Sequence, residues 1–347
     1  MSSLTSLTAL LQESGAQFRI YDMGRQIKKI SSQQFALIEK GQQVYPRPYL
    51  HHAWLALLMW NPKHKQQNVV WFLKFPLDEQ GYLVQAVRDD FINRLMLNIN
   101  QMLAEKELAE AEDALKDNPF SFTPDQEKMA MFHAITARET QAGKSQYYLP
   151  CQQYFHAAVN ADQWQALGLQ GIAEIAVSID EHKQPIIKNF DAYHNEPLIA
   201  LCCALEHSSI DHNLATTIEH KLQTCLTGEN QDIALCCALL RALHAAPNEA
   251  MKQNAIILLL NSNIADSAEL LSTIAVKMSE QLLQPNTLLL YLEKLATSEA
   301  GQQGFSRILA DLMFSDSLRR PILQAFRNPE RSEQLTAAIG NMFGNKF

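Results

Sequence analysis

The sequence has few of the residues that break regular structure. Its 347 residues include only twelve Gly and thirteen Pro, and this scarcity favours helices over a β architecture with many turns. Long apolar runs are also missing. The run at residues 53–60 is far shorter than the roughly 20 residues that cross a bilayer. The first fifteen residues lack a basic start and a small-residue cleavage site, so no secretory signal is predicted.

Positive charge is in deficit. The chain carries 29 Lys and Arg against 37 Asp and Glu, which gives a net charge of −8. A protein that follows a phosphate backbone normally has a basic face, so the composition argues against nucleic acid as the partner. The six cysteines form no spaced framework, a pattern that suits free thiols in a reducing cytoplasm. At this length two or three domains are expected.

Familiar enzyme signatures are absent as well. The sequence contains no G-x-x-x-x-G-K-[ST], G-x-G-x-x-G, H-E-x-x-H or G-x-S-x-G. These patterns mark common nucleotide-binding proteins, metalloproteases and α/β-hydrolases. No cofactor and no metal is therefore predicted. An enzyme of an unfamiliar kind stays open, although the balance is towards a protein without catalytic activity.

Residues 1–118 predict a small α+β domain. Two runs with β-favouring residues, 17–24 and 25–31, meet at a turn. A helix follows, with a serine N-cap and Gly41 at its carboxyl end. Two apolar segments separated by the loop NPKHKQQ come next. The second of them, 68–75, is the best strand in the sequence because it is rich in β-branched and aromatic residues.

A long helix is predicted at the end of this domain. Val87, Phe91, Leu95 and Ile99 recur every four residues and form an apolar stripe along one helix face. The acidic, Ala-rich stretch at 104–115 is expected to leave the core.

Residues 119–185 are expected to form a mixed, mostly helical connecting region. Thr123 is predicted to cap a helix whose first position is Pro124. Residues 143–185 give no firm prediction, because two glycines interrupt the helical pattern there.

Residues 186–347 contain a repeat. The hexapeptide ALCCAL occurs at 200–205 and again at 234–239, an offset of 34 residues. Helix starts recur at about the same interval, which predicts stacked helix–turn–helix units. The stretch 198–205 is apolar on every side, so its helix must be covered by neighbours all round. The predicted capping residues are Asn195, Asp211, Asn230, Asn248, Asn286 and Asp316, with further starts near Asp266 and Gly301.

The predicted architecture is an α+β N-terminal domain followed by an all-α, HEAT-like helical-hairpin repeat. This α-solenoid has about four helix pairs and a terminal helix. The period matches tetratricopeptide repeats, but their Trp, Leu-Gly and Tyr signature is absent. The last segment is polar and carries Arg319, Arg320, Arg327 and Arg331, so it is suited to cap the array.

Four residues are the weak candidates for a catalytic or ligand site: Lys74, Asp78, Glu79 and Arg88, in and after LKFPLDEQGYL. Two acids near a lysine are able to carry out acid–base chemistry or to hold a magnesium ion. The simpler interpretation is a turn between two apolar segments.

A second candidate region lies beside the YPRP break. Arg47, Tyr49, His51 and His52 are suited to line a pocket there, and functional residues often lie on loops. A solvated loop is the simpler alternative.

The paired cysteines at 202–203 and 236–237, with histidines nearby, invite a zinc hypothesis. Adjacent cysteines point about 100° apart on a helix, whereas structural zinc sites use C-x₂₋₄-C spacing. Small core residues are therefore the better interpretation of these pairs. The single cysteines Cys151 and Cys225 show no nucleophile signature and are also expected to be structural.

Four segments carry a family resemblance: YDMGR (21–25), YPRP (45–48), WFLKFPLDEQGYL (71–83) and RDDF (88–91). Together they resemble an uncharacterised gammaproteobacterial family known as a domain of unknown function. The likeness covers nearly the whole chain. It implies a bacterial, cytoplasmic protein and brings no activity, substrate or site residue with it.

The main functional hypothesis is a cytoplasmic, non-enzymatic adaptor or scaffold that binds a protein or peptide in the groove of its helical repeat. The alternative is an enzyme or a small-ligand-binding regulator with its site near LKFPLDEQGYL. A third option is association with RNA or DNA through the basic segment at 319–331.

Overall fold

A computed structural model of the chain describes residues 6–13, 17–61, 64–105, 118–157, 161–228 and 231–344. The chain divides into two compact units. The sheet unit comprises Met1–Lys128 and Glu139–Ala142, and the helical unit comprises Met129–Arg138 and Gly143–Phe347. Within the described ranges no helix is both long and apolar enough to cross a membrane.

The strands of the sheet unit are β1 (Gln17–Asp22), β2 (Lys28–Ile30), β3 (His52–Asn61) and β4 (His64–Pro76). They form an antiparallel sheet in the order β2-β1-β3-β4. Ile20 of β1 lies opposite Leu57 of β3, which lies opposite Trp71 of β4, so the three share one face. Leu73 and Phe75 follow Trp71 at alternate positions of β4 and lie on the same face. All five side chains are buried.

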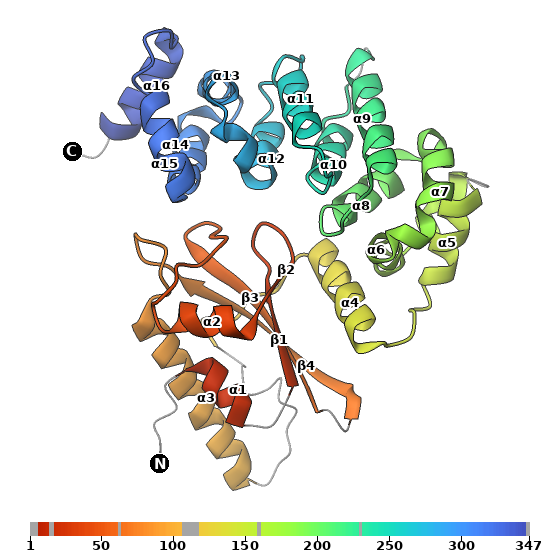
Figure 1. Cartoon of the computed structure of the whole chain (residues 1–347), viewed down its shortest axis with the longest axis vertical. Coiled ribbons are helices and arrows are strands. Elements are labelled where there is room, and N and C mark those ends of the chain that lie inside the picture. The colour runs from red at the N-terminus through yellow and green to blue at the C-terminus, as the bar shows by residue number, and fades with distance from the viewer. Residues whose placement is uncertain are drawn as a thin grey trace. The chain divides into compact units, whose positions relative to one another are not determined.

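The helices of the sheet unit are α1 (Leu7–Glu13), α2 (Ser32–Glu39) and α3 (Gln85–Glu105). α1 and α2 contact β1, and α3 contacts β4, so the helices form a second layer on the sheet (Figure 1). The Phe91 ring of α3 meets the Phe75 ring edge-on, with ring centroids 5.4 Å apart. This small α+β arrangement confirms the predicted class of the N-terminal region.

Several local predictions in the sheet unit are also confirmed. Ser31 caps α2, since its hydroxyl accepts a hydrogen bond from the Gln34 amide at 3.1 Å. Gly41 follows the helix with a φ of +65°, which favours glycine. Phe91 and Leu95 of the apolar stripe are fully buried. Beyond Glu105 the acidic stretch predicted to leave the core lies outside the described residues, as do the surroundings of the Ile99 side chain.

The loop predicted at NPKHKQQ is shorter in the structure than the sequence suggested, so its predicted length is wrong. β3 continues to Asn61 and β4 already begins at His64, because backbone pairing extends past the apolar segments into polar sequence. Strand pairing depends on backbone groups that every residue except proline carries. The polar composition alone therefore mispredicts the strand ends.

The prediction that Thr123 caps a helix is also wrong. Helix α4 (Gln126–Thr140) begins later, and the Asp125 carboxylate accepts the capping hydrogen bond from the Lys128 amide at 2.7 Å. The preceding segment is extended along β4, where the Phe122 amide donates to the Phe72 carbonyl at 3.1 Å. Sheet pairing thus delays the start of the helix.

The helical unit is a long succession of helices with short connections. Its helices after α4 are α5 (Tyr148–Ala157), α6 (Leu169–Val177), α7 (Ile179–Asn189), α8 (Asn195–Leu205), α9 (His212–Thr227), α10 (Ile233–Leu243), α11 (Glu249–Leu260), α12 (Ala268–Lys277), α13 (Pro285–Ala296), α14 (Gly301–Met313), α15 (Asp316–Ala325) and α16 (Glu333–Gly344). Short 3₁₀ turns, η2 (Ala161–Ala166), η3 (Phe190–Ala192) and η4 (Ser279–Leu283), lie between some of them. A helical C-terminal region is therefore confirmed.

Alternate helices contact each other, which sorts them into two rows (Figure 1). The first row contains α6, α8, α10, α12 and α14, and the second contains α5, α7, α9, α11 and α13. The last two helices, α15 and α16, each contact both α13 and α14. The two ALCCAL hexapeptides lie on α8 and α10, which are neighbours in the first row. Both rows begin before residue 186.

One apolar core runs through the helical unit from Cys151 to Ala338. In α8, Leu198, Leu201 and Leu205 have no exposed surface. Burial on several sides agrees with the prediction that this helix needs neighbours all round. Each added pair of helices extends the same core.

Asp211 and Asn248 cap α9 and α11 as predicted, since their side chains accept hydrogen bonds from the Leu214 and Ala250 amides. Other predicted caps are displaced, and Asn230 lies outside the described residues. The observed N-cap positions are His194 in place of Asn195, Gln284 in place of Asn286 and Ser315 in place of Asp316, and Asp232 caps α10. The helix start predicted near Asp266 is confirmed, since Ser267 caps α12.

The glycines that interrupt the pattern in 143–185 mark a close approach of α5 and α6. A Cβ atom at Gly171 would lie 2.2 Å from the Tyr147 carbonyl oxygen and 2.7 Å from Cys151 Sγ. A Cβ atom at Gly168 would lie 2.8 Å from the Tyr147 ring. The backbone of α6 therefore packs directly on α5, which only glycine permits.

Gly171→Ala is expected to lower the free energy of unfolding of the helical unit by about 2 kcal/mol or more, because the two helices must move apart. Gly340→Ala is the matched control. A Cβ atom there meets nothing within 4 Å. Because alanine has the higher helix propensity, the control is expected to stabilise α16 by up to about 1 kcal/mol. Urea unfolding followed by circular dichroism at 222 nm measures both. Equal effects of the two changes would contradict the close packing of α6 on α5.

Candidate functional site

The four predicted site residues lie in three different local settings. Asp78 and Glu79 lie in the turn between β4 and α3, where Glu79 is exposed. Asp78 Oδ1 accepts hydrogen bonds from the Gln80 and Tyr82 amides, each at 2.9 Å. Gly81 completes the turn with a φ of +86°. The Asp78 carboxylate thus stabilises the turn.

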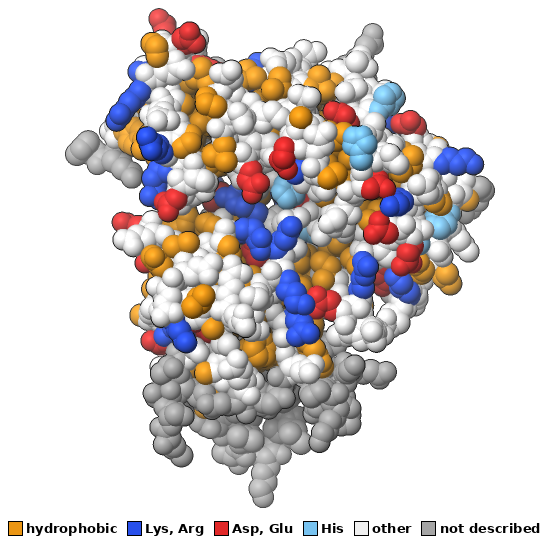
Figure 2. Space-filling model, in the orientation of Figure 1, with side chains coloured by type: hydrophobic (Ala, Val, Ile, Leu, Met, Phe, Trp, Pro, Cys, Tyr) orange, Lys and Arg blue, Asp and Glu red, His pale blue; other side chains and the backbone are white. Residues whose placement is uncertain are grey.

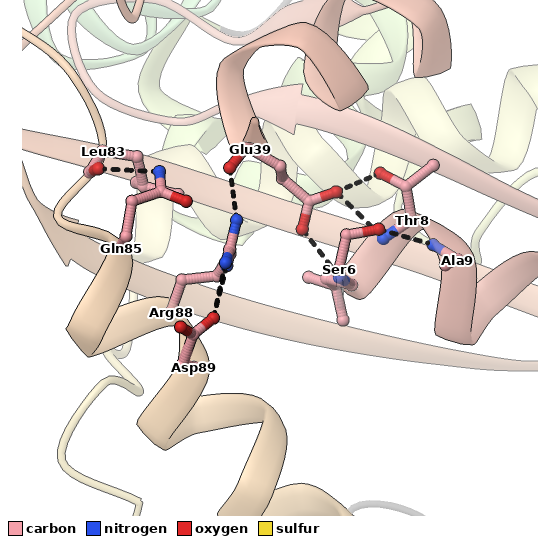
Figure 3. A network of polar contacts seen from close by, with 9 residues as sticks. Ser6, Thr8, Ala9, Glu39, Leu83, Gln85, Arg88 and Asp89 are labelled. Atoms are coloured by element: carbon pink, nitrogen blue, oxygen red, sulfur yellow. Dashed lines mark hydrogen bonds and ion pairs between the residues drawn. The ribbon is translucent and has the colours of Figure 1, made fainter. Parts of the chain in front are cut away.

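Arg88 belongs to a network around the buried carboxylate of Glu39 (Figure 3). This carboxylate accepts hydrogen bonds from the Leu7 and Thr8 amides at 2.7 and 3.0 Å, so α2 caps the first turn of α1. Arg88 donates to the Glu39 carbonyl oxygen and pairs with Asp89. Burial raises the pKa of Glu39, and the hydrogen bonds from Thr8 and Leu7 oppose that shift. Arg88 therefore joins α3 to α2.

Lys74 belongs to a different group, the Gly24 cluster. Lys74 Nζ lies 4.4 Å from the centre of the Trp54 ring. Arg25 and Lys128 lie 5.7 and 5.9 Å from the centre of the Tyr49 ring. Cations at these distances are attracted by the electron-rich ring face. The cluster is defined as Asp22, Gly24, Arg25, Tyr45, Arg47, Tyr49, Trp54, Lys74 and Lys128.

Gly24 lies at the centre of this cluster. Its amide donates to Asp22 Oδ1 at 3.1 Å, and its carbonyl accepts from Lys128 Nζ at 2.8 Å. A Cβ atom at this position would lie 3.1 Å from Tyr49 Cβ and 3.6 Å from Trp54 Cδ1. The turn after β1 therefore brings backbone, aromatic rings and cations together.

Asp22 is the buried carboxylate of the Gly24 cluster. Tyr45 Oη donates to Asp22 Oδ1 at 2.8 Å, and Arg47 Nε donates to Oδ2 at 2.9 Å. Burial raises the pKa of Asp22, while the hydrogen bonds from Gly24 and Tyr45 and the charge of Arg47 lower it. The segments YDMGR and YPRP, distant in sequence, meet at this carboxylate.

A strained turn adjoins the Gly24 cluster. Tyr49 and His52 exchange two backbone hydrogen bonds of 3.1 Å around Leu50 and His51. Leu50 and His51 have φ values of +49° and +60°, as in the hairpin turn that normally takes Asn-Gly. Such strain costs about 1–3 kcal/mol per residue and is concentrated at functional sites. Of the second candidate region, Arg47 and Tyr49 thus belong to the cluster and the two histidines to the turn.

In the helical unit a buried ion cluster surrounds Glu206, at the end of α8. Glu206 is 1% exposed and lies 2.7 Å from Arg241 Nε, 2.9 Å from Lys277 Nζ and 3.1 Å from His207 Nε2. Burial raises the pKa of Glu206, but Lys277, His207 and Arg241 outweigh that effect and hold it well below its usual range. These ions join α8, α10 and α12 of the first row.

The paired cysteines are core residues. Cys202, Cys203, Cys236 and Cys237 are at most 5% exposed. Burial raises the pKa of Cys236 to about 12 and that of Cys237 to about 11. These shifts disfavour the thiolate that would bind a metal or attack a substrate. In the part of the chain that the structure describes, no three His, Cys, Asp or Glu side chains gather in a way that could hold a metal.

A chain of titratable groups links α5 and α7. Tyr148 Oη lies 3.1 Å from His182 Nε2, and His156 Nε2 lies 2.8 Å from His182 Nδ1. His182 is 1% exposed. Burial lowers the pKa of His182, and the neighbouring His156 lowers it further. When both rings are neutral, one of the two nitrogens donates the hydrogen bond and the other accepts it. When both rings are protonated, both nitrogens carry a hydrogen and no acceptor remains.

The basic segment at 319–331 is partly used by helix ends. Arg319 Nε donates to the Met313 carbonyl at 3.0 Å, and Arg331 donates to the Phe326 carbonyl. These contacts close the carboxyl ends of α14 and α15, as cations at helix ends commonly do. On the face drawn in Figure 2, acidic, basic and apolar side chains are interspersed over the helical unit.

Sequence reasoning missed Asp22, Trp54, His182 and Glu206. A signal existed for Glu206, because it precedes Arg241 by 35 residues, one more than the 34-residue offset of the hexapeptide. Oppositely charged residues at one repeat interval are expected to lie on neighbouring helices. For Asp22, Trp54 and His182 no pattern in the sequence predicts the contacts, because they form between segments that are distant in the sequence.

The free energy of unfolding of the helical unit is expected to fall as the pH drops from about 6.5 to 5. The folded pKa of His182 lies below its usual value of 6.5, so the unfolded chain binds more protons in this range. His182→Gln removes that contribution and gives a smaller pH dependence. His220→Gln is the control, since His220 is exposed on α9 and lies outside this chain of groups. Urea unfolding at several pH values measures this, and parallel curves for both variants would refute it.

Glu206→Gln is expected to lower the free energy of unfolding at pH 7 by about 3 kcal/mol, since it leaves two largely buried cations without their carboxylate. Glu280→Gln, an exposed acid in η4, is expected to stay within about 0.5 kcal/mol of the parent. Chemical unfolding followed at 222 nm compares them. Similar values for the two variants would show that the ion cluster does not stabilise the first row.

A family model described as "Protein of unknown function (DUF3549)" matches residues 2–343, nearly the whole chain. The chain therefore belongs to this family, which confirms the predicted membership of a domain-of-unknown-function family. No curated protein and no solved structure matches the chain.

Proposed function

We propose that the protein is a non-enzymatic adaptor or scaffold of the bacterial cytoplasm, whose helical unit binds a protein or peptide partner. In this proposal the helical unit is a HEAT-like α-solenoid. The supporting observation is the arrangement in two rows: from α5 to α14 each helix contacts the next helix of its own row, and one apolar core runs through the whole succession.

Stacked helix pairs suit this function for a physical reason. Each pair buries its apolar sides on its neighbours, so the stack grows in one direction and presents an extended surface. Such a surface offers many contact points to a long partner without needing a deep pocket. The absence of familiar enzyme signatures is compatible with this role.

Exposed apolar side chains of α11 and α15 are the proposed contact points. Ile257 and Leu258 of α11 are each 39% exposed, and Leu323 of α15 is 40% exposed. Single exposed apolar residues are common on protein surfaces. Photocrosslinking distinguishes partner contacts from ordinary surface residues.

The alternative of an enzyme or a small-ligand regulator near LKFPLDEQGYL has less support. It needs Lys74, Asp78, Glu79 and Arg88 to act together. Instead Asp78 stabilises a turn, Arg88 contacts the Glu39 carbonyl and Lys74 lies on the Trp54 ring.

Photocrosslinking in cells tests the scaffold proposal. A photoreactive residue at Ile257 is expected to capture one protein, while the same residue at Leu37 of α2, 43% exposed, does not capture it. With that partner purified, Ile257→Asp with Leu258→Asp should weaken its binding about tenfold or more, because apolar contacts are replaced by charge. Leu37→Asp is the matched control.

Two outcomes would contradict the proposal. One is the same capture from both positions. The other is unchanged binding of the purified partner after residues 186–347 are deleted. Circular dichroism of each substituted variant separates loss of binding from loss of the fold.

A further inference from the structure

We propose that the contact between α5 and α7 is an acid-sensitive switch, in which α5 separates from α7 once His156 and His182 are both protonated. The helices from α8 onward stay folded in that state. The switch is a local opening, whereas the pH dependence of unfolding described above concerns the whole helical unit. It does not depend on the scaffold function, because it involves only contacts within the unit.

The first argument is the position of His182 between two side chains of one helix. Tyr148 begins α5 and His156 lies in its last turn. His182 Nε2 lies 3.1 Å from Tyr148 Oη, and Nδ1 lies 2.8 Å from His156 Nε2, so both of its ring nitrogens are engaged. The ring centroids of Tyr148 and His156 lie 5.9 and 5.0 Å from that of His182. α5 thus provides both hydrogen-bond partners and part of the cover of a side chain that is 1% exposed.

The second argument is the number of protons that this chain of groups accommodates. One added proton is tolerated, because a charged ring donates to its neutral neighbour. A second proton leaves the 2.8 Å contact with two donors, no acceptor and two like charges. Rotation of the His156 ring alone does not relieve this, since a charged His182 would stay buried with an unpaired donor. Water reaches His182 only if α5 moves.

The third argument is the set of charges around the two rings. Burial and His156 lower the pKa of His182, Lys144 lowers it further, and Glu181 opposes the shift. Glu181 is exposed, so water screens its charge. The acids of the neighbouring helices are engaged elsewhere: Glu174 of α6 accepts from the Ser145 amide at 3.1 Å, and Asp211 at the start of α9 pairs with Lys183 at 2.9 Å.

The fourth argument is the place of α5 in the stack. It is the first helix of the second row and packs on α6, α7 and η2 (Figure 1). At neutral pH, Asn189 and Tyr193 also hold its carboxyl end by donating to the His156 and Phe155 carbonyls. Release of α5 breaks these contacts at one end of the stack and leaves the later helices in place. Such a local opening needs less free energy than global unfolding.

Hydrogen exchange of the full-length chain, followed by mass spectrometry, tests the switch. Rates are corrected for the pH dependence of intrinsic exchange. Between pH 7 and 5.5, the protection of the α5 amides is expected to fall about fivefold or more, because an opening that takes up one proton changes by up to tenfold per pH unit. The protection of the α10 amides is expected to stay the same.

His156→Gln is the most informative variant. The glutamine carbonyl accepts a hydrogen bond from a protonated His182, and the side chain does not titrate. The acid-dependent loss of protection in α5 is therefore expected to disappear. His220→Gln is the matched control and should behave as the parent, since His220 is exposed on α9 and lies outside this chain of groups. If His156→Gln does not fold at pH 7, His182→Gln serves the same comparison.

Three results would overturn the proposal. The first is unchanged protection of α5 in the parent at pH 5.5, which would mean that the His156 ring moves without its helix. The second is an equal loss of protection in α5 and α10, which would indicate global unfolding. The third is the same loss in the parent and in His156→Gln. A loss confined to α5, present in the parent and His220→Gln and absent in His156→Gln, would support it.

Discussion

Helices without a polar side impose the architecture of the helical unit. α8 and α10 carry the same apolar hexapeptide, and most side chains of both helices are buried. Both must be surrounded, and a row of similar helices with a second row behind it meets that need. Cysteine suits such positions because it is small, apolar and compatible with tight packing. The cysteine pairs therefore follow from packing and not from metal chemistry.

Buried carboxylates then fix particular segments to one another. Asp22 joins the turn after β1 to the YPRP segment, and Glu39 joins α1 and α2. Glu206 joins three helices of the first row. Each carboxylate is satisfied by several donors, as burial of a charge requires. Apolar burial would allow many arrangements of similar energy, whereas these contacts favour one register between the segments they connect.

The sequence predicts the fold class well and the sites poorly, for different physical reasons. Helix starts and the repeat depend on local capping and on periodicity, which one segment carries by itself, as at Asp211 and Asn248. Strand ends depend on backbone pairing with a distant segment, so β3 and β4 extend beyond their apolar residues. Candidate site residues grouped by closeness in sequence have different partners, since Lys74 lies on the Trp54 ring and Asp78 accepts hydrogen bonds within its own turn. The residues around Gly24 come instead from strands, loops and the start of α4, and no spacing rule connects them.

One contact in the helical unit determines more than local stability. Lys277 of α12 reaches Glu206 at the end of α8, although α10 lies between them in the row. Axes of packed helices are about 8–10 Å apart, so this bond draws together the carboxyl ends of helices two places apart. At the amino ends of the same row, Asn195 Nδ2 of α8 donates to Asp232 Oδ2, at the N-cap of α10, at 3.0 Å. Because one buried carboxylate pairs with both Arg241 and Lys277, loss of its charge would loosen the carboxyl ends of three helices of the row at once.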